Sequence, residues 1–89
     1  MNELQFTSNG WNDYCYWQNH DKKTLAKINK LLSEITRDHM NGTGKPESLK
    51  GDLSGCWSRH INDKDRIIYC ILDNNVIQII SCRNHYGDH

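Results

Sequence analysis

The strongest pattern in this sequence is a set of apolar residues at helical spacing in its first half. An apolar residue recurs every three or four positions, at Leu25, Ile28, Leu32 and Ile35, which is the period of one face of an α-helix. Asp21 precedes this set, where its side chain can cap the first turn. Asn41-Gly42-Thr43-Gly44 follows it and is typical of a helix end. The pattern therefore predicts an amphipathic helix that must pack its apolar face against another element.

A second helix and four strands are expected around this one. Ser8 can cap a helix over roughly residues 9–20, with one side formed by Trp11, Tyr14, Cys15 and Gln18. Strands are expected at residues 4–6, 55–61, 66–72 and 76–83, and residues 41–53, with the only proline, are expected to form a loop. This order predicts an α+β fold, with an N-terminal strand and two helices packed on one face of a curved, mainly antiparallel four-stranded sheet.

The last two strands predict which side chains share a face. If Asn74-Asn75 is a two-residue turn, counting back along both strands places Arg66 opposite Arg83. His85 then lies one diagonal step away on the same side. A three-residue turn would break this alignment, because a slip of one residue moves every side chain to the other face.

The length of 89 residues predicts one domain, residues 1–89, in which a shallow groove for a long polymer fits better than a deep pocket. No run of about 20 apolar residues could span a membrane, and Met1-Asn2-Glu3 does not begin a signal peptide, so a cytoplasmic protein is expected. The cysteines should then be reduced thiols, and their spacing does not match a zinc site. They are Cys15, Cys56, Cys70 and Cys82.

Charge is distributed unevenly along the chain, although its sum is zero. Zero net charge gives no general attraction to nucleic acid. Residues 21–40 are net positive, and three lysines of this segment lie away from the apolar stripe, at Lys23, Lys27 and Lys30. A solvated helix face is one explanation of this pattern.

Three motifs stand in the second half of the chain. They are Gly44-Lys45-Pro46-Glu47 with Ser48-Leu49-Lys50 after it, then Gly55-Cys56-Trp57-Ser58-Arg59, and finally Cys82-Arg83-Asn84-His85-Tyr86. In this order and spacing they resemble the YoeB family of bacterial toxins, within the RelE superfamily, over nearly the whole chain. The resemblance implies a RelE-like, microbial-ribonuclease-like fold and a toxin that cleaves messenger RNA on the ribosome and so inhibits translation.

The resemblance also implies roles in a cleavage by the RNA's own 2′-hydroxyl. Glu47 is the candidate general base, Arg66 the clamp on the phosphate, His85 the general acid, and Tyr86 the residue that stacks on a base or orients the substrate. Further RNA or phosphate contacts are implied for Lys50, Arg59, His60 and Arg83. This chemistry needs a base, a cation and an acid, and no metal or other cofactor.

Each catalytic role has an ordinary structural alternative. Glu47 can be a plain loop carboxylate, and His85 can be a solvated residue near the chain end. Arg66 can be a strand-edge arginine paired with Asp63 or Asp65.

The chain also departs from the family pattern in its cations and its end. His60 stands where the family usually has a second arginine, and it would be only partly charged near pH 7, which weakens its hold on phosphate. Gly87-Asp88-His89 follow the His-Tyr pair at which family members commonly stop.

Partners are implied by the family as well. They are a YefM-like antitoxin with a disordered acidic tail, the ribosome with its messenger RNA, and operator DNA bound only through the antitoxin complex. Ribosomal RNA contacts are implied for Lys23, Lys27 and Lys30. A homodimer is compatible with so small a domain.

Two other classes of function fit these residues less well. ParE-type toxins share the fold and act on DNA gyrase without cutting RNA, but they lack the Glu, Arg and His-Tyr set. A metal-binding or regulatory module would have to use the five histidines and four cysteines, whose spacing is scattered.

Overall fold

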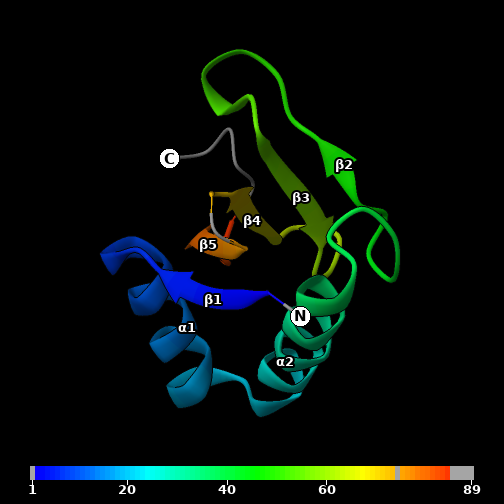
Figure 1. Ribbon diagram of the computed structural model, residues 1–89. Coiled ribbons are helices and arrows are strands. Elements are labelled where there is room, and N and C mark those ends of the chain that lie inside the picture. Colours follow the sequence, from blue (N-terminus) through cyan, green and yellow to red (C-terminus); the bar gives the residue numbers. More distant parts are fainter. Residues whose placement is uncertain (1, 74, 85–89) are drawn as a thin grey trace.

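The computed structural model describes residues 2–73 and 75–84. The elements are β1 (Glu3–Phe6), α1 (Ser8–His20), α2 (Lys22–Arg37), β2 (Glu47–Ser48), β3 (Cys56–His60), β4 (Arg66–Ile71) and β5 (Val76–Ser81), with a 3₁₀ turn at Gly51–Leu53. The sheet order is β1-β5-β4-β3-β2, with β1 parallel to β5 and the other pairs antiparallel. Both helices lie on the same side of the sheet (Figure 1). The predicted α+β arrangement is confirmed.

The sheet has one strand more than the four that the sequence predicts. Within the predicted loop of residues 41–53, Glu47 pairs with Ser58 and Ser48 pairs with Trp57. A strand of two residues has no alternation that a sequence pattern can reveal. The extra strand is the one that carries the candidate base.

Helix α1 begins at a different cap from the one predicted, and the side that the sequence singles out is only partly buried. The side chain of Thr7, rather than that of Ser8, accepts a hydrogen bond from the Gly10 backbone at 3.0 Å. The buried residues of α1 are Gly10 and Trp17, whereas Trp11 is 50% exposed. Gly10 lies so close to the backbone of β5 that a Cβ would overlap it, so α1 packs directly against that strand.

Helix α2 follows its prediction closely. Asp21 caps it through a 3.1 Å hydrogen bond from the Thr24 backbone. The helix ends at Arg37, four residues before the predicted stop signal begins. Its buried residues are Ile28, Leu31, Leu32 and Ile35, and Leu25 packs partly buried against the same core. None of the described helices is long and apolar enough to cross a membrane.

The two faces of the sheet bury apolar side chains unequally. The face toward the helices forms the main core, whose fully buried members include Ile67, Tyr69, Ile77 and Ile79. The opposite face, called the open face below, carries a small cluster. This floor cluster consists of Leu49, Cys56 and Ile68, with Leu53, Cys70 and Ile80 packed against it.

The β4–β5 hairpin departs from the predicted register near its turn and returns to it beyond a bulge. The turn is one residue longer than the predicted two. Tyr69 pairs with Ile79, but Ile68 pairs with Ser81, so β5 holds one extra residue, Ile80. The Ile68–Ser81 pair is the one that the predicted register requires, because the bulge compensates for the longer turn.

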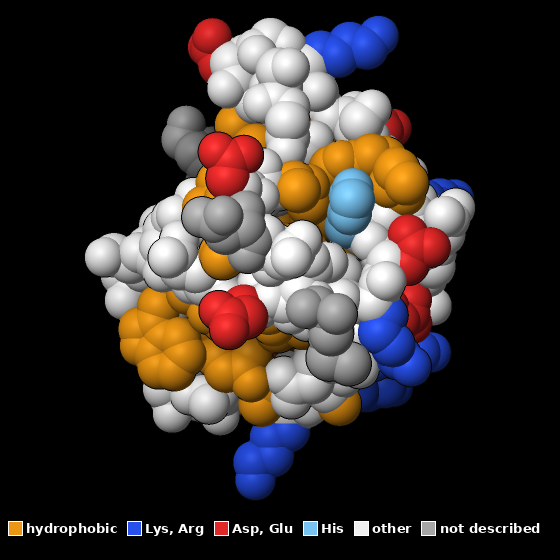
Figure 2. All heavy atoms as spheres, in the orientation of Figure 1, with side chains coloured by type: hydrophobic (Ala, Val, Ile, Leu, Met, Phe, Trp, Pro, Cys, Tyr) orange, Lys and Arg blue, Asp and Glu red, His pale blue; other side chains and the backbone are white. Residues whose placement is uncertain are grey.

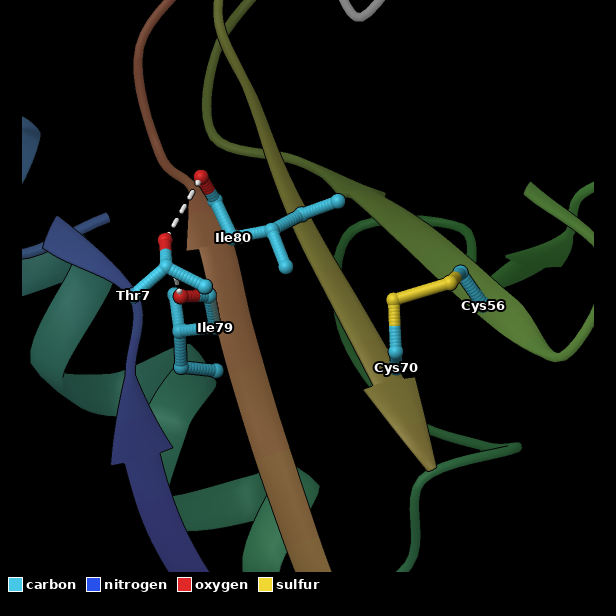
Figure 3. The surroundings of a disulfide bond; sticks show 5 residues. All are labelled: Thr7, Cys56, Cys70, Ile79 and Ile80. Atoms are coloured by element: carbon cyan, nitrogen blue, oxygen red, sulfur yellow. Dashed lines mark hydrogen bonds between the residues drawn. A yellow bond between two sulfur atoms is a disulfide. The ribbon is translucent and has the colours of Figure 1, made fainter. Parts of the chain in front are cut away.

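The bulge is held by the start of α1. The Thr7 hydroxyl bonds to the carbonyl oxygens of Ile79 and Ile80, each at 3.4 Å (Figure 3), and the Asn9 amide donates to the Ile80 carbonyl at 2.8 Å. The Thr7 and Asn9 side chains thus satisfy the carbonyl of Ile80, the extra residue of the bulge, while the Ile79 carbonyl also accepts the Thr7 N–H at 3.0 Å.

The expectation of four reduced thiols is wrong for one pair of cysteines. Cys56 and Cys70 are direct partners on β3 and β4 and form a disulfide, which bridges the two strands in Figure 3. Cys15 and Cys82 are free. The partners are 14 residues apart, so only the strand register reveals that they meet.

Candidate active site

Glu47 stands on the short strand β2, at the rim of an open hollow. The hollow has a volume of about 560 Å³ and is lined by Glu47, Ser48, Leu49, Lys50 and Leu53. Glu47 is exposed, whereas Leu49 is buried in the floor cluster and its N–H donates to the Cys56 carbonyl at 2.9 Å. Leu49 therefore anchors the segment, and the Glu47 carboxylate remains open to solvent.

The chain enters β2 through a tight turn. Gly44 has φ 89° and Lys45 has φ 54°, the left-handed region that suits glycine but is unusual for lysine. The Gly44 carbonyl accepts a 2.6 Å hydrogen bond from the His60 N–H, and a Cβ on Gly44 would come within 2.8 Å of the His60 carbonyl. The turn is thus fastened to β3, and Pro46 then limits how the chain leaves it.

Strand pairing places Glu47, His60 and Arg66 on the open face. Glu47 pairs with Ser58, and His60 pairs with Arg66. Cross-strand partners share a face, as do residues two apart on one strand, and Ile68, the partner of Ser58, belongs to the floor cluster of that face. Glu47 and Arg66 stand two strand spacings apart across the sheet and two residues apart along it, so their Cα atoms are separated by roughly 12 Å, with His60 on the strand between them.

His60 is held neutral by its surroundings. Burial, and then the positive charges of Arg66 and Lys45, lower the pKa of its imidazole below the usual value, against weaker opposing effects of Glu47 and Asp63. At neutral pH it is therefore a hydrogen-bonding group rather than a cation, which agrees with the sequence-based expectation of incomplete charge at this position.

Arg66 begins β4 and is partly exposed. One nitrogen of its guanidinium donates to the carbonyl oxygens of Asn62 at 2.8 Å and Asp65 at 3.1 Å. The structural alternative for Arg66 was an ion pair with the carboxylate of Asp63 or Asp65. Within the described residues, the guanidinium bonds to these two backbone carbonyls instead. A guanidinium held by one edge can present its other nitrogens to a phosphate.

Asp65 is a site residue that sequence reasoning missed. Its buried carboxylate accepts hydrogen bonds from the Asn84 N–H at 2.6 Å and from the Asn62 side chain at 3.1 Å. The Arg66 N–H donates to the Asn84 carbonyl at 3.0 Å. These bonds dock residue 84 beside Arg66. No local pattern distinguishes this aspartate from its neighbours in the turn.

Helix α1 holds the same C-terminal segment from the other side. The Trp17 indole donates to the Cys82 carbonyl at 2.7 Å, and the Asp13 carboxylate accepts from the Cys82 N–H at 3.0 Å. The candidate acid His85 and its neighbour Tyr86 follow directly but lie outside the described residues, so their predicted roles stay predictions.

Arg83 does not pair with Arg66, because the Arg66 backbone bonds to Asn84 instead. The Arg83 guanidinium lies over the Tyr16 ring of α1, 3.5 Å from the ring centre. It is therefore committed to a cation–π contact, and the predicted sharing of one surface by Arg66 and Arg83 is not observed. Lys50, by contrast, lines the same hollow as Glu47.

Arg59 cannot make the further phosphate contact expected of it, because its side chain is fully buried on the helix side. Its guanidinium donates to the Tyr69 hydroxyl at 3.1 Å and to the Glu34 carboxylate at 3.3 Å. Three further bonds of 2.8–3.2 Å reach the carbonyl oxygens of Asp38, Asn41 and Thr43. These bonds tie the segment before β2 to the sheet, so Arg59 is a structural residue.

The three lysines of α2 stand apart from the open face. Lys23 and Lys27 line a second hollow of about 250 Å³ together with Thr24, Ile61 and Asn62. Lys30 is exposed one turn further along the helix. Basic side chains gather on the α2 side of the view in Figure 2, with acidic ones beside them.

The sequence matches a family model described as the YoeB-like toxin of bacterial type II toxin-antitoxin systems over residues 6–86. The chain belongs to the YoeB toxin family. Toxin YoeB of Streptomyces coelicolor is 48% identical over 93% of this chain and 98% of that protein. Toxin YoeB of Synechocystis is 50% identical over 94% and 96%, and that of Escherichia coli K12 is 43% identical over 94% and 99%.

Solved structures show the same fold as this YoeB-family chain. A YoeB/ParE toxin from Agrobacterium tumefaciens superposes with a TM-score of 0.90 at 40% identity, covering 94% of this chain and 99% of that one. A YoeB dimer from Staphylococcus aureus gives 0.85 at 44%, covering 96% and 98%. A heterotetrameric YoeB–YefM toxin–antitoxin complex from the same organism gives 0.85 at 44%, covering 97% and 99%.

Proposed function

We propose that this YoeB-family toxin is a ribosome-dependent endoribonuclease that cuts messenger RNA without a metal ion. The observation that carries the proposal is the shared open face of Glu47 and Arg66, beside the docked segment that leads into His85. Backbone positions roughly 12 Å apart, by the spacing and rise of strands, leave room for a ribose and its phosphate between the two side chains.

In the proposed reaction the RNA supplies its own nucleophile. Glu47 removes the proton from the 2′-hydroxyl, whose oxygen attacks the adjacent phosphorus. Arg66 binds phosphate oxygens and stabilises the negative charge that grows on them. His85 gives a proton to the departing 5′-oxygen, and Tyr86 stacks on a base or orients the substrate.

Two further open-face residues complete the proposed phosphate site. Lys50 supplies a second positive charge at the hollow that Glu47 lines. His60, which is neutral in the free protein, offers a hydrogen bond rather than a charge. With Arg59 buried and Arg83 stacked on Tyr16, Lys50 is the charge and His60 the neutral donor that remain from the larger set of phosphate contacts that the sequence suggested.

The α2 lysines are proposed as the contact with ribosomal RNA. Lys23, Lys27 and Lys30 lie on one helix, away from the open face, so ribosome binding and cleavage can be separated by mutation. Replacing all three by alanine should weaken ribosome binding and flatten its dependence on salt, and an unchanged salt slope would reject the contact. Lys22→Ala on the same helix is the matched control.

The proposed partners follow from the toxin role of the family. A YefM-like antitoxin would silence the toxin by laying an acidic segment near the cations of the open face, and the complex would bind operator DNA through the antitoxin. A homodimer and a cytoplasmic location belong to the same proposal. YoeB–YefM and YoeB dimer structures of Staphylococcus aureus support the antitoxin partner and the homodimer.

The chemistry of the cut ends tests the function. Purified toxin, intact ribosomes and one translated message should give fragments with a 2′,3′-cyclic phosphate or 3′-phosphate and a 5′-hydroxyl, which polynucleotide kinase labels without prior phosphatase treatment. Cleavage should persist with a chelator of transition metals that leaves ribosomal Mg²⁺ in place. Fragments with 5′-phosphates would contradict the mechanism, and an uncut message with inhibited gyrase would favour the ParE-type alternative.

A further inference from the structure

The Cys56–Cys70 disulfide lies on the open face, in the same ladder of residue pairs as the candidate site. Successive pairs of β3 and β4 on this face are Cys56–Cys70, Ser58–Ile68 and His60–Arg66. The disulfide is therefore two pairs away from Arg66, and only one pair away from Ser58, the strand partner of Glu47.

The disulfide also forms part of the floor beneath the candidate base. Leu49 and Leu53, which line the hollow together with Glu47, pack in the floor cluster with both cysteines. The Leu49 N–H bonds to the Cys56 carbonyl at 2.9 Å. The two residues of β2 depend on these contacts, because a strand so short has little pairing of its own.

Breaking the bond must change this floor. Two sulfur atoms that are no longer bonded need a separation of roughly 3.5–4.0 Å, while the pairing of β3 and β4 keeps the two residues directly opposite each other. At least one thiol must therefore turn into the space of its apolar neighbours, Leu49, Leu53 or Ile80 (Figure 3 shows Ile80 reaching toward the bond from β5). The β3–β4 ladder keeps the thiols adjacent, so the bond can form again.

We propose that Cys56 and Cys70 form a reversible thiol–disulfide exchange site, acted on by dithiol reductants, whose oxidised state holds the Glu47 segment in its active position. The effect on cleavage rests on the proposed function, whereas the effect on the floor does not.

The dithiol reductant supplies the electrons and protons of the exchange. One thiolate of the dithiol attacks the sulfur of Cys70, the more exposed partner, and Cys56 leaves as a thiolate. The second thiol of the reductant then displaces Cys70 and leaves as a cyclic disulfide. Two electrons and two protons pass to the protein.

In the described structure, neither of the other two cysteines is placed to act as the exchange site. Cys82 is buried, and burial, followed by the charges of Asp13 and Asp65, raises the pKa of its thiol to about 12, which disfavours the reactive thiolate. Cys15 is free and lies on α1, on the other side of the sheet. It serves as the matched control.

The test compares the wild-type chain in two states, after oxidation and after reduction with dithiothreitol, without any substitution. Hydrogen exchange of the Leu49 amide should become at least about tenfold faster on reduction, and Tm should fall by roughly 10 °C or more, as expected for loss of a crosslink across about 15 residues. The Leu25 amide, at the far end of α2, should change less. Cleavage of the translated message should slow at least about tenfold, because small displacements of a catalytic group are costly.

Variants assign the response to its cysteines. The double variant Cys56→Ser/Cys70→Ser should match the reduced state under both conditions, and Cys15→Ser should respond like the wild type. Equal Leu49 exchange and equal cleavage in both states would overturn the inference, as would a response that Cys15→Ser abolishes. Faster Leu49 exchange with no cleavage in either state would support the exchange site and count against the proposed function.

Discussion

The helix face and the open face of the sheet use the same kinds of residue for different purposes. On the helix face, Arg59 is fully buried, and its donors are taken up by a carboxylate, a hydroxyl and three carbonyl oxygens. On the open face, Arg66 is only partly buried and bonds through one nitrogen to two carbonyls. One arginine is part of the structure, and the other retains capacity for a ligand.

Strand parity decides between these two roles. Ser58, Arg59 and His60 are consecutive in β3, and alternate side chains of a strand point to opposite faces. A motif that looks like one basic patch in the sequence is therefore divided, with its arginine in the core and its histidine on the open face. If this division is right, substituting Arg59 should change stability, and substituting Arg66 should change activity.

The largest effect is expected from Arg59. Arg59→Met should lower the free energy of unfolding by about 3–5 kcal/mol, because Glu34 loses its partner and the buried polar groups around Arg59 lose their donors. Urea unfolding measures the loss, with Arg37→Met on the exposed end of α2 as the control. A loss below about 1 kcal/mol would show that Arg59 is not the structural residue described.

Arg66 should show the opposite behaviour. Arg66→Ala is expected to slow cleavage of a translated message by about 10²–10³-fold, the usual cost of removing a group that stabilises transition-state charge, and to change unfolding by no more than about 1 kcal/mol. Arg66→Lys should recover part of the rate, since it keeps the charge but loses the planar fork. Full activity of a folded Arg66→Ala variant would remove the clamp from the mechanism.

A smaller effect is expected where α1 meets the bulge of β5. Thr7→Ala should cost about 1 kcal/mol of stability, because Thr7 caps α1 and bonds to β5. Ser8→Ala should stay within about 0.5 kcal/mol, as for an ordinary surface change. Thermal unfolding of the two variants compares the observed cap with the predicted one, and a larger loss for Ser8→Ala would reverse the assignment.

The sequence predicted those parts of the fold that depend on local periodicity. Helix α2 was located by its apolar spacing, and its cap Asp21 by residue type. Strand β2 was missed because two residues carry no period, and the disulfide was missed because only the register brings Cys56 and Cys70 together. The bulge at Ile80 was also beyond local rules, since α1 stabilises it from a distant part of the chain.

The candidate site was predicted mainly as a set of residues, and the one arrangement that was predicted, Arg66 opposite Arg83, is not observed. Glu47, His60 and Arg66 share the open face. Arg59 was misassigned, because charged residues are rarely fully buried and no local signal announces five hydrogen-bonding partners. Asp65 was overlooked as an ordinary turn residue, although it docks the segment that leads to His85.

The most direct test of the account is the single-turnover rate of message cleavage by Glu47→Gln on translating ribosomes, measured beside its unfolding free energy. Glutamine keeps the size and position of the side chain but cannot accept the 2′-hydroxyl proton. The account predicts a rate at least about 100-fold lower with unfolding changed by less than about 1 kcal/mol, and an unchanged rate for the exposed control Glu3→Gln. A folded Glu47→Gln variant that cuts at the wild-type rate would contradict it.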